Sequence, residues 1–283
     1  MNDAYRHCEE LVRAADKDRF LAALFAPAEK RGALHALYAF NIEIARVRDA
    51  IREPMAGEIR LQWWRDVLGG ERAGEGAANP VAAALFDTIA RFALSTEPLL
   101  GLVEAHAFDL YDDPMPTLAA MEAYLRRTSV TLIGQAARVL AGGHPVVADM
   151  AEPAGLGCGM TGLLRAVARH ASRRQLYVPL DVLERHGADP EDVFVGNATP
   201  ALGAALSELR IRAGAQLSDF EALLPRLPEA AAPAFLTVAL ARADLVAMDR
   251  RGFDPFTVVE APQWRRQWTL WRAARRYGRV MRG

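Results

Sequence analysis

Two adjacent arginines just before a tyrosine are the strongest candidates for binding chemistry in this chain. Arg173 and Arg174 precede Tyr177 in the stretch Arg-Arg-Gln-Leu-Tyr-Val-Pro. A guanidinium group offers its N–H donors in a planar fork, which suits the oxygens of a phosphate or a carboxylate. The pattern predicts an anion-binding site in a loop that follows a helix. The alternative is that both arginines form salt bridges that hold this loop in place.

A lone carboxylate, Asp49, follows two cations in the run Ala-Arg-Val-Arg-Asp. Magnesium is a hard ion that takes oxygen ligands, and one aspartate beside Arg46 and Arg48 cannot organise a cluster of such ions. We therefore expect no metal site and no cofactor. Asp49 and Arg48, with Tyr38 upstream, are candidates for the lining of a cavity or an anion site. Asp49 could equally pair with an arginine to neutralise a buried charge.

His170 is a lone imidazole on an apolar side of a predicted helix. It could serve as a metal ligand or a proton carrier, because its pKa lies near neutrality in water. A structural role, with the ring held by a hydrogen bond, is the more common outcome for a lone histidine. We keep His170 as a candidate for the cavity lining.

The composition is that of a soluble globular protein. Of the 283 residues, 52% are hydrophobic and 24% are charged, and the formal net charge is −1. This balance gives no reason to expect nucleic acid as a partner. The cysteines, Cys8 and Cys158, lie far apart and suggest a reduced, cytoplasmic setting. We expect no apolar run of the ~20 residues that are needed to cross a bilayer.

The elements that must position these residues are helices. Ala, Leu, Arg and Glu dominate the chain, and Pro and Gly fall mostly between segments. Between 29 and 52 the apolar residues recur at steps of three or four, which indicates a continuous buried stripe. The stretches 69–80, 142–146 and 187–200 are predicted loops, so one all-α domain over 1–283 is expected. The predicted helices span 3–16, 29–52, 55–69, 80–94, 97–110, 117–141, 147–170, 200–223, 228–250 and 263–280.

Two segments resemble the signature regions of squalene and phytoene synthases. The first runs from Arg19 to Lys30-Arg31 and on through Ala36 to Asp49. The second runs from Gly157 to His170 and continues into the loop with the two arginines. The resemblance implies an isoprenoid-synthase-type helical fold around a central cavity. In that family each signature is an Asp-rich helix whose carboxylates hold magnesium ions, and these ions grip the diphosphate of a prenyl donor.

The resemblance fails at the metal-binding positions. The family's Asp-Asp-x-x-Asp aligns with residues 45–49, where only Asp49 is acidic. In the second signature, the family's Gln, Asn, Asp and Asp align with Gly159, Gly162, Ala166 and His170. Those positions share one side of a helix. Catalysis of the family type is therefore not expected.

Several short stretches resemble a non-catalytic branch of the family, the complex I assembly factor 6-like proteins. These are 40–49, 164–166, 170–174 and 191–194. This resemblance implies an assembly factor for respiratory complex I. Its expected partner is a membrane-arm subunit or an assembly intermediate of that complex. The expected location is the cytoplasm, with peripheral contact to the inner membrane as an open possibility.

Two other functions stay open at this point. One is an active prenyl transferase that condenses two prenyl diphosphates head to head, for which Mg²⁺ would be the cofactor. The other is a binding protein that keeps an isoprenoid or lipid tail in the cavity without reacting it.

Tryptophans mark two further places. In the pair Trp63-Trp64, one ring is expected in the core and the other at the surface. Near the end of the chain, Trp264, Trp268 and Trp271 share one side of a helix that is rich in arginine. Such a helix either docks on an anionic membrane or a partner protein, or closes the core with its rings.

Overall fold

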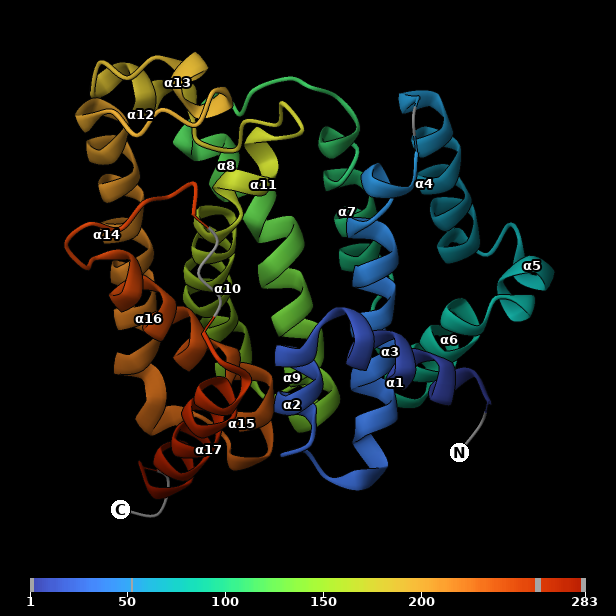
Figure 1. The fold of residues 1–283 in the computed structure, drawn as a ribbon. Coiled ribbons are helices and arrows are strands. Elements are labelled where there is room, and N and C mark those ends of the chain that lie inside the picture. The colour runs from blue at the N-terminus through green and yellow to red at the C-terminus, as the bar shows by residue number, and fades with distance from the viewer. Residues whose placement is uncertain (1–2, 52, 258–260, 281–283) are drawn as a thin grey trace.

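The computed structural model describes residues 3–51, 53–257 and 261–280, and every regular element in these ranges is a helix. The all-α prediction is therefore confirmed. Figure 1 shows the long helices running up and down the molecule, with the first and last described helices, α1 (Asp3–Ala15) and α17 (Gln263–Val280), near its lower end.

Between these two helices the chain forms further α-helices and short 3₁₀ or π turns, which are labelled η. In order they are α2 (Lys17–Ala23), α3 (Ala28–Ala45), η1 (Arg48–Ala50), α4 (Pro54–Gly69), α5 (Ala73–Ala78), α6 (Pro80–Phe92), α7 (Glu97–Ala105), η2 (Phe108–Leu110), α8 (Leu118–Leu125), η3 (Arg126–Val130), α9 (Thr131–Ala141), α10 (Pro145–Arg165), α11 (Val167–Ala171), α12 (Leu180–Arg185), α13 (Pro190–Phe194), α14 (Pro200–Leu223), η4 (Leu224–Arg226), η5 (Glu229–Ala231), α15 (Ala232–Phe235) and α16 (Thr237–Met248).

The long helix α10 packs against α9, η3, α14 and α16. Its glycines permit this close packing. A Cβ at Gly155 would collide with the backbone of Val130 in η3, and a Cβ at Gly157 would collide with Leu217 in α14. Because a protein interior is packed almost as densely as a crystal, these contacts leave no space for a side chain. The helix that carries the second signature is thus fixed from two sides.

Several predicted helices are interrupted. The predicted helix 29–52 ends at Ala45 and continues as the 3₁₀ turn η1, and the helix 117–141 contains the π turn η3. The helix 147–170 breaks at Ala166, where φ is −97° and ψ is 5°. The segment 228–250 is divided into η5, α15 and α16. The apolar pattern predicted which residues are helical, but it could not predict the single irregular turns that interrupt these helices.

Four short helices, α2, α5, α12 and α13, were not predicted. Two of them begin at aspartate caps. The Asp16 carboxylate accepts the backbone N–H of Arg19 at 3.0 Å, and Asp189 accepts that of Glu191 at 2.9 Å. Such caps satisfy N–H groups that the first helical turn leaves unpaired. A helix of five to seven residues is too short to show an apolar period.

The segment Glu229–Met248 is long and apolar enough to cross a membrane, with a mean hydropathy of 1.5, so the expectation of no such run was wrong. However, 61% of the most apolar part of this segment is buried inside the protein. Core helices of globular proteins often have this composition. The segment is therefore part of the core, where Phe235 stacks on Phe220 of α14.

The tryptophan pair of α4 lies as predicted. Trp64 is buried and packs edge-to-face on Phe40 of α3, with ring centroids 5.0 Å apart. Trp63 is partly exposed and donates its indole N–H to Glu75 of α5 at 2.9 Å. This pair holds α4 and α5 against the bundle.

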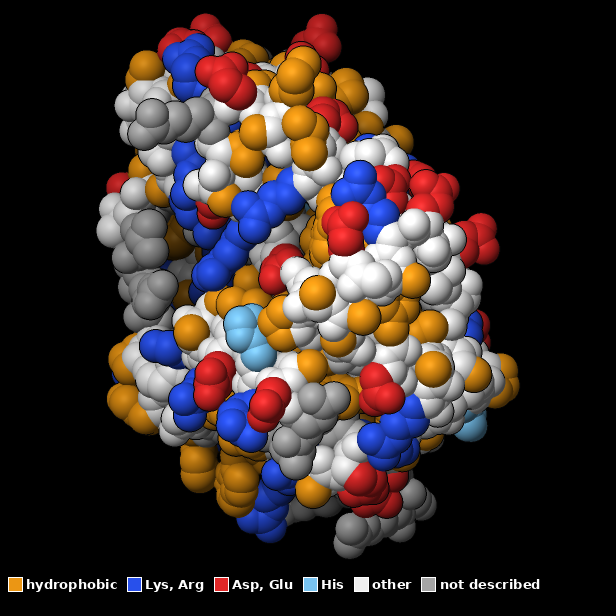
Figure 2. Space-filling model, turned by 90° about the vertical axis from the view of Figure 1, so that its right-hand side faces the viewer, with side chains coloured by type: hydrophobic (Ala, Val, Ile, Leu, Met, Phe, Trp, Pro, Cys, Tyr) orange, Lys and Arg blue, Asp and Glu red, His pale blue; other side chains and the backbone are white. Residues whose placement is uncertain are grey.

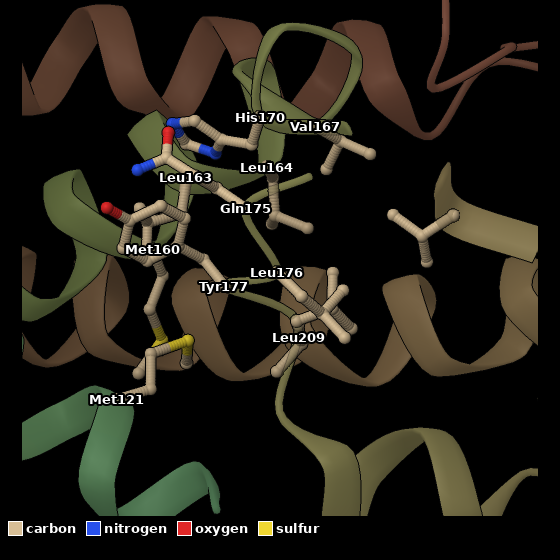
Figure 3. A pocket seen from close by; sticks show the side chains of 12 residues that line it. Met121, Met160, Leu163, Leu164, Val167, His170, Gln175, Leu176, Tyr177 and Leu209 are labelled. Atoms are coloured by element: carbon tan, nitrogen blue, oxygen red, sulfur yellow. The ribbon is translucent and has the colours of Figure 1, made fainter. Parts of the chain in front are cut away.

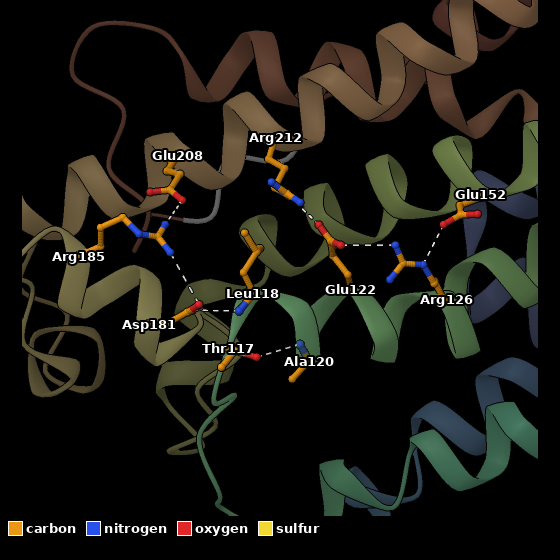
Figure 4. A network of polar contacts seen from close by, with 10 residues as sticks. All are labelled: Thr117, Leu118, Ala120, Glu122, Arg126, Glu152, Asp181, Arg185, Glu208 and Arg212. Carbon is orange, nitrogen blue, oxygen red and sulfur yellow. Dashed lines mark hydrogen bonds and ion pairs between the residues drawn. The ribbon is translucent and has the colours of Figure 1, made fainter.

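A polar network joins α8, α12 and α14 on another side (Figure 4). The carboxylate of Asp181 accepts the N–H of Leu118 at 2.9 Å and so caps α8, while Arg185 bridges Asp181 and Glu208. Glu122 accepts from Arg212 of α14 at 2.6 Å. These contacts fix α8, which contributes Tyr124 to the site described next.

Candidate cleft and its charged lining

A cleft of about 460 Å³ opens between α3, α10 and α11. It is lined by five of the seven predicted candidates: Arg48, Asp49, His170, Arg173 and Tyr177. They come from η1, from α11 and from the loop after α11, so the fold brings the two signature regions together. Figure 2 shows the side of the molecule that carries α4 and α5, where Lys and Arg side chains form a band beside a hollow.

Asp109, in η2, is a buried carboxylate in the lining of the cleft. Its carboxylate accepts the hydroxyl of Tyr177 at 2.5 Å and that of Tyr124 at 3.1 Å. Nδ1 of His106 lies 2.5 Å from the same carboxylate. Gln175 donates to the backbone carbonyl of Asp109 at 3.0 Å. A buried carboxylate is stable only when such partners satisfy it, and here they do.

The two tyrosines are held as donors by this arrangement. Burial raises the pKa of Tyr177 and of Tyr124 well above the usual value of a phenol, and the negative charge of Asp109 adds to the effect. Loss of either phenolic proton would place a second negative charge beside Asp109. The network is therefore a fixed part of the cleft floor.

His170 lies over this floor, with its ring centroid 4.5 Å from that of Tyr177. Burial and the nearby Arg169 lower the pKa of His170 to about 4, although Asp109 acts in the opposite direction. The ring is neutral at physiological pH. It therefore adds no positive charge to the cleft.

Asp49 and Arg173 form an ion pair that joins η1 to the loop after α11. Arg48 pairs with Asp112 at 3.0 Å, and that aspartate is exposed. Within the described ranges, no carboxylate lies within ion-pair distance of Arg46 or Arg169, which also line the cleft. The cleft thus has cations without internal partners, whereas its aspartates are all bonded.

The prediction that Tyr38 lines the cavity was wrong. Tyr38 is 4% exposed and lies beneath Arg19, whose guanidinium carbon is 5.9 Å from the ring centroid. Arg19 in turn pairs with Asp16 at 2.6 Å, and these two residues do line the cleft. Burial opposes the charge on Arg19, but the Asp16 carboxylate outweighs it and raises the pKa of Arg19. The Asp16–Arg19 pair covers Tyr38.

Arg174 also lies apart from the cleft lining, contrary to the prediction. Its backbone φ is +54°, in the left-handed region, so its side chain leaves the loop in a different direction from that of Arg173. Its guanidinium lies 4.6 Å from the ring centroid of Phe194 and 3.5 Å from Glu191. Arg174 thus fits the alternative to anion binding, in which a salt bridge holds the loop, here to Glu191 of α13.

Gly159 and Gly162, the two positions of α10 that align with the family's Gln and Asn, carry no side chain here. A Cβ at Gly159 would lie 2.6 Å from Leu125 Cδ2 and 2.9 Å from Ser129 Oγ, so neighbouring side chains fill this position. At Gly162 no atom lies within 4 Å, and the position opens on the cleft. The helix contributes shape to the cleft but no ligand atoms at these sites.

The residues present do not fit the magnesium ions that the family uses. In the described part of the chain, no three His, Cys, Asp or Glu side chains gather around a point where a metal could bind. The cleft carboxylates, Asp16, Asp49 and Asp109, are each bonded to a cation or to hydroxyl donors. A magnesium cluster would have to displace these partners and to tolerate the arginines.

An apolar hollow lies behind the floor of the cleft and encloses only about 10 Å³ (Figure 3). Side chains fill it from several elements: Met121 from α8, Met160 and Leu164 from α10, and Leu209 from α14. A single water molecule needs comparable space. An isoprenoid tail has no room there in this conformation.

Sequence reasoning missed Asp109, His106 and Gln175. The spacing of His106 and Asp109 places both on one side of a helical turn, in a stretch that is otherwise apolar. That isolated polar pair was the available signal. The contact of Asp109 with Tyr177 joins residues 68 positions apart, and no sequence pattern indicated it.

Comparison with known proteins gives a consistent result. The profile of the squalene/phytoene synthase family matches residues 12–272. The rat protein named NADH dehydrogenase (ubiquinone) complex I, assembly factor 6 is 31% identical over 90% of this chain and 76% of its own length. The chloroplastic phytoene synthase of Narcissus pseudonarcissus is 26% identical over 91% of this chain and 62% of its own length. A dehydrosqualene synthase structure superimposes with a TM-score of 0.81 and 18% identity, covering 98% of this chain and 97% of that one. The chain belongs to the squalene/phytoene synthase family.

Proposed function

We propose that this protein is a non-catalytic member of its family that assists the assembly of respiratory complex I. Support comes from its likeness to the rat and human proteins named as complex I assembly factor 6, at 31% and 29% identity. The proposed partner is a membrane-arm subunit or an assembly intermediate of complex I. The proposed location is the cytoplasm, with peripheral contact to the inner membrane.

The observation that carries the non-catalytic part is the charge arrangement of the cleft. The ion pair of Asp49 with Arg173 occupies the one carboxylate of residues 45–49, which align with the family's Asp-Asp-x-x-Asp. Arg46 and Arg169 line the same space. Ionisation of a prenyl diphosphate needs metal ions that neutralise the leaving group, and this lining repels such ions. The filled apolar hollow, at about 10 Å³, leaves no room for a prenyl or lipid tail behind the floor of the cleft.

The assembly role is tested by deleting the gene in its own host and measuring complex I. We expect less assembled complex I on native gels and lower NADH:quinone activity, with succinate dehydrogenase activity unchanged as the control. A plasmid copy of the gene should restore both. If complex I were fully assembled in the deletion strain, the assembly role would be wrong.

The non-catalytic role is tested separately with purified protein, Mg²⁺ and farnesyl or geranylgeranyl diphosphate. We expect no squalene, dehydrosqualene or phytoene and no release of diphosphate. Turnover by the wild-type protein that disappears in Asp49→Asn would instead establish a prenyl transferase.

A further inference from the structure

The last helix, α17, carries its tryptophans on the outside of the molecule. Trp264, Trp268 and Trp271 are 62%, 53% and 40% exposed. The rings therefore do not close the core, which was one of the two possibilities left by the sequence. Exposed tryptophans that gather on one helix are uncommon on a soluble surface and mark an interaction site.

The opposite side of α17 fixes the direction in which these rings point. Leu270, Ala273 and Tyr277 are buried against the bundle. Arg266 donates to Asp18 of α2 at 2.7 and 2.5 Å and to Asp244 of α16 at 3.2 Å. Figure 1 shows α17 at the lower edge of the molecule beside α15 and α16. The helix cannot rotate to bury the tryptophans without breaking this partly buried ion triad.

Arginines border the exposed rings. Arg265, Arg272, Arg275 and Arg276 are all exposed, and among the described residues none of them has a carboxylate within ion-pair distance. The helix sequence 263–280 contains no Asp or Glu. The cationic surface is thus local, since the formal net charge of the chain is −1.

The arginines also hold the rings in place. The guanidinium of Arg275 lies 4.8 Å from the Trp271 ring, and that of Arg265 lies 5.2 Å from the Trp264 ring. Trp268 stacks on Trp271 with centroids 4.8 Å apart. Between Trp264 and Arg275 the ridge is about 17 Å long, at the 1.5 Å rise per residue of an α-helix.

We propose that the outer face of α17, formed by Trp264, Trp268 and Trp271 with the arginines around them, binds the headgroup region of an anionic phospholipid membrane. Indole rings prefer this region because one edge is apolar and the N–H is polar. Arginines beside them are attracted to anionic headgroups. A helix face without carboxylates is complementary to a broad negative surface, whereas a protein partner would need an acidic groove of matching length. This inference does not depend on the proposed role in complex I assembly.

The test is co-sedimentation of the full chain with vesicles of phosphatidylcholine, alone or mixed with phosphatidylglycerol. We expect binding to the mixed vesicles, little binding to phosphatidylcholine alone, and a blue shift of tryptophan emission in the mixed vesicles. Added salt should weaken binding, because it screens the charges.

Variants separate the two parts of the face. Arg272→Gln with Arg275→Gln should bind the mixed vesicles about twenty-five-fold more weakly, since each surface arginine contributes roughly a five-fold factor. Trp268→Ala with Trp271→Ala should abolish the emission shift and most of the binding. Matched controls away from α17 are Ile211→Ala, at an exposed position of α14, and Arg91→Gln, at an exposed position of α6, and both should bind as wild type does. Unchanged thermal melting of all variants shows that they are folded.

Failure of the wild-type protein to bind mixed vesicles, or equal binding by the tryptophan variant, would overturn the proposal. If the wild-type chain were instead a dimer that the tryptophan substitutions convert to a monomer, with no vesicle binding, the face would be a self-association surface and the proposal would be wrong.

Discussion

Asp49 and Arg173, which lie 124 positions apart in the sequence, form an ion pair in the lining of the cleft. The pair links the turn after α3 to the loop after α11, which are the two signature regions of the family. It also occupies the carboxylate that would otherwise be available to a metal. Asp49 therefore links the turn η1 to the loop after α11.

We expect the Asp49–Arg173 pair to contribute little to stability. Both side chains are more than a third exposed, at 37% and 40%, and such pairs are worth roughly 0–1 kcal/mol. A double-mutant cycle with Asp49→Asn and Arg173→Gln, measured by urea unfolding, should give a coupling below about 1 kcal/mol. A coupling of several kcal/mol would mean that the pair is effectively buried.

The Asp109 network should matter far more. Asp109→Asn leaves two tyrosine hydroxyls competing for one acceptor, and we expect a loss of about 2–4 kcal/mol in the free energy of unfolding. Tyr177→Phe should cost about 1–2 kcal/mol. The matched control is Tyr111→Phe, because Tyr111 is 45% exposed and its bond to Glu58 faces solvent. Equal effects of the two tyrosine substitutions would contradict a structural role for the network.

The free energy of unfolding should fall as the pH is lowered, because protonation of His170 favours the unfolded chain. The folded protein holds the pKa of His170 at about 4, below the 6.5 of the free side chain. Between those values the unfolded chain binds the proton and the folded chain does not, so stability is full above about pH 6.5 and is lost as the pH falls toward 4. The full effect is at most about 3 kcal/mol. His170→Gln should flatten this part of the pH profile, whereas substitution of the exposed His144 should leave it unchanged.

Two glycines of α10 should respond in opposite ways to alanine. Gly159→Ala forces a Cβ against Leu125 and Ser129, and we expect a loss of about 1–3 kcal/mol. At Gly162 no atom lies within 4 Å, so Gly162→Ala should stabilise the helix by about 0.5–1 kcal/mol. Thermal unfolding of both variants checks the difference, and a destabilising Gly162→Ala would show that the cleft closes over this position.

The loss of the metal-binding face could be inferred from the sequence, because it depends on residue types at helical spacing. Gly159, Gly162 and Ala166 occupy positions that repeat every three or four residues, and no tertiary contact can supply oxygen atoms that these side chains lack. The helical class likewise followed from the apolar period of segments such as 29–52.

Tertiary structure alone decided which polar residues meet. Arg173 and Arg174 are neighbours in the chain, yet a left-handed backbone at Arg174 sends one side chain to Asp49 and the other to Glu191. Asp109 became the centre of the cleft floor through Tyr177, a contact between distant segments. The sequence placed Trp264, Trp268 and Trp271 on one side of a helix, but the ion triad of Arg266 decided that this side faces out. Helical period reports which side chains share a face, and only packing against other elements determines whether that face is buried.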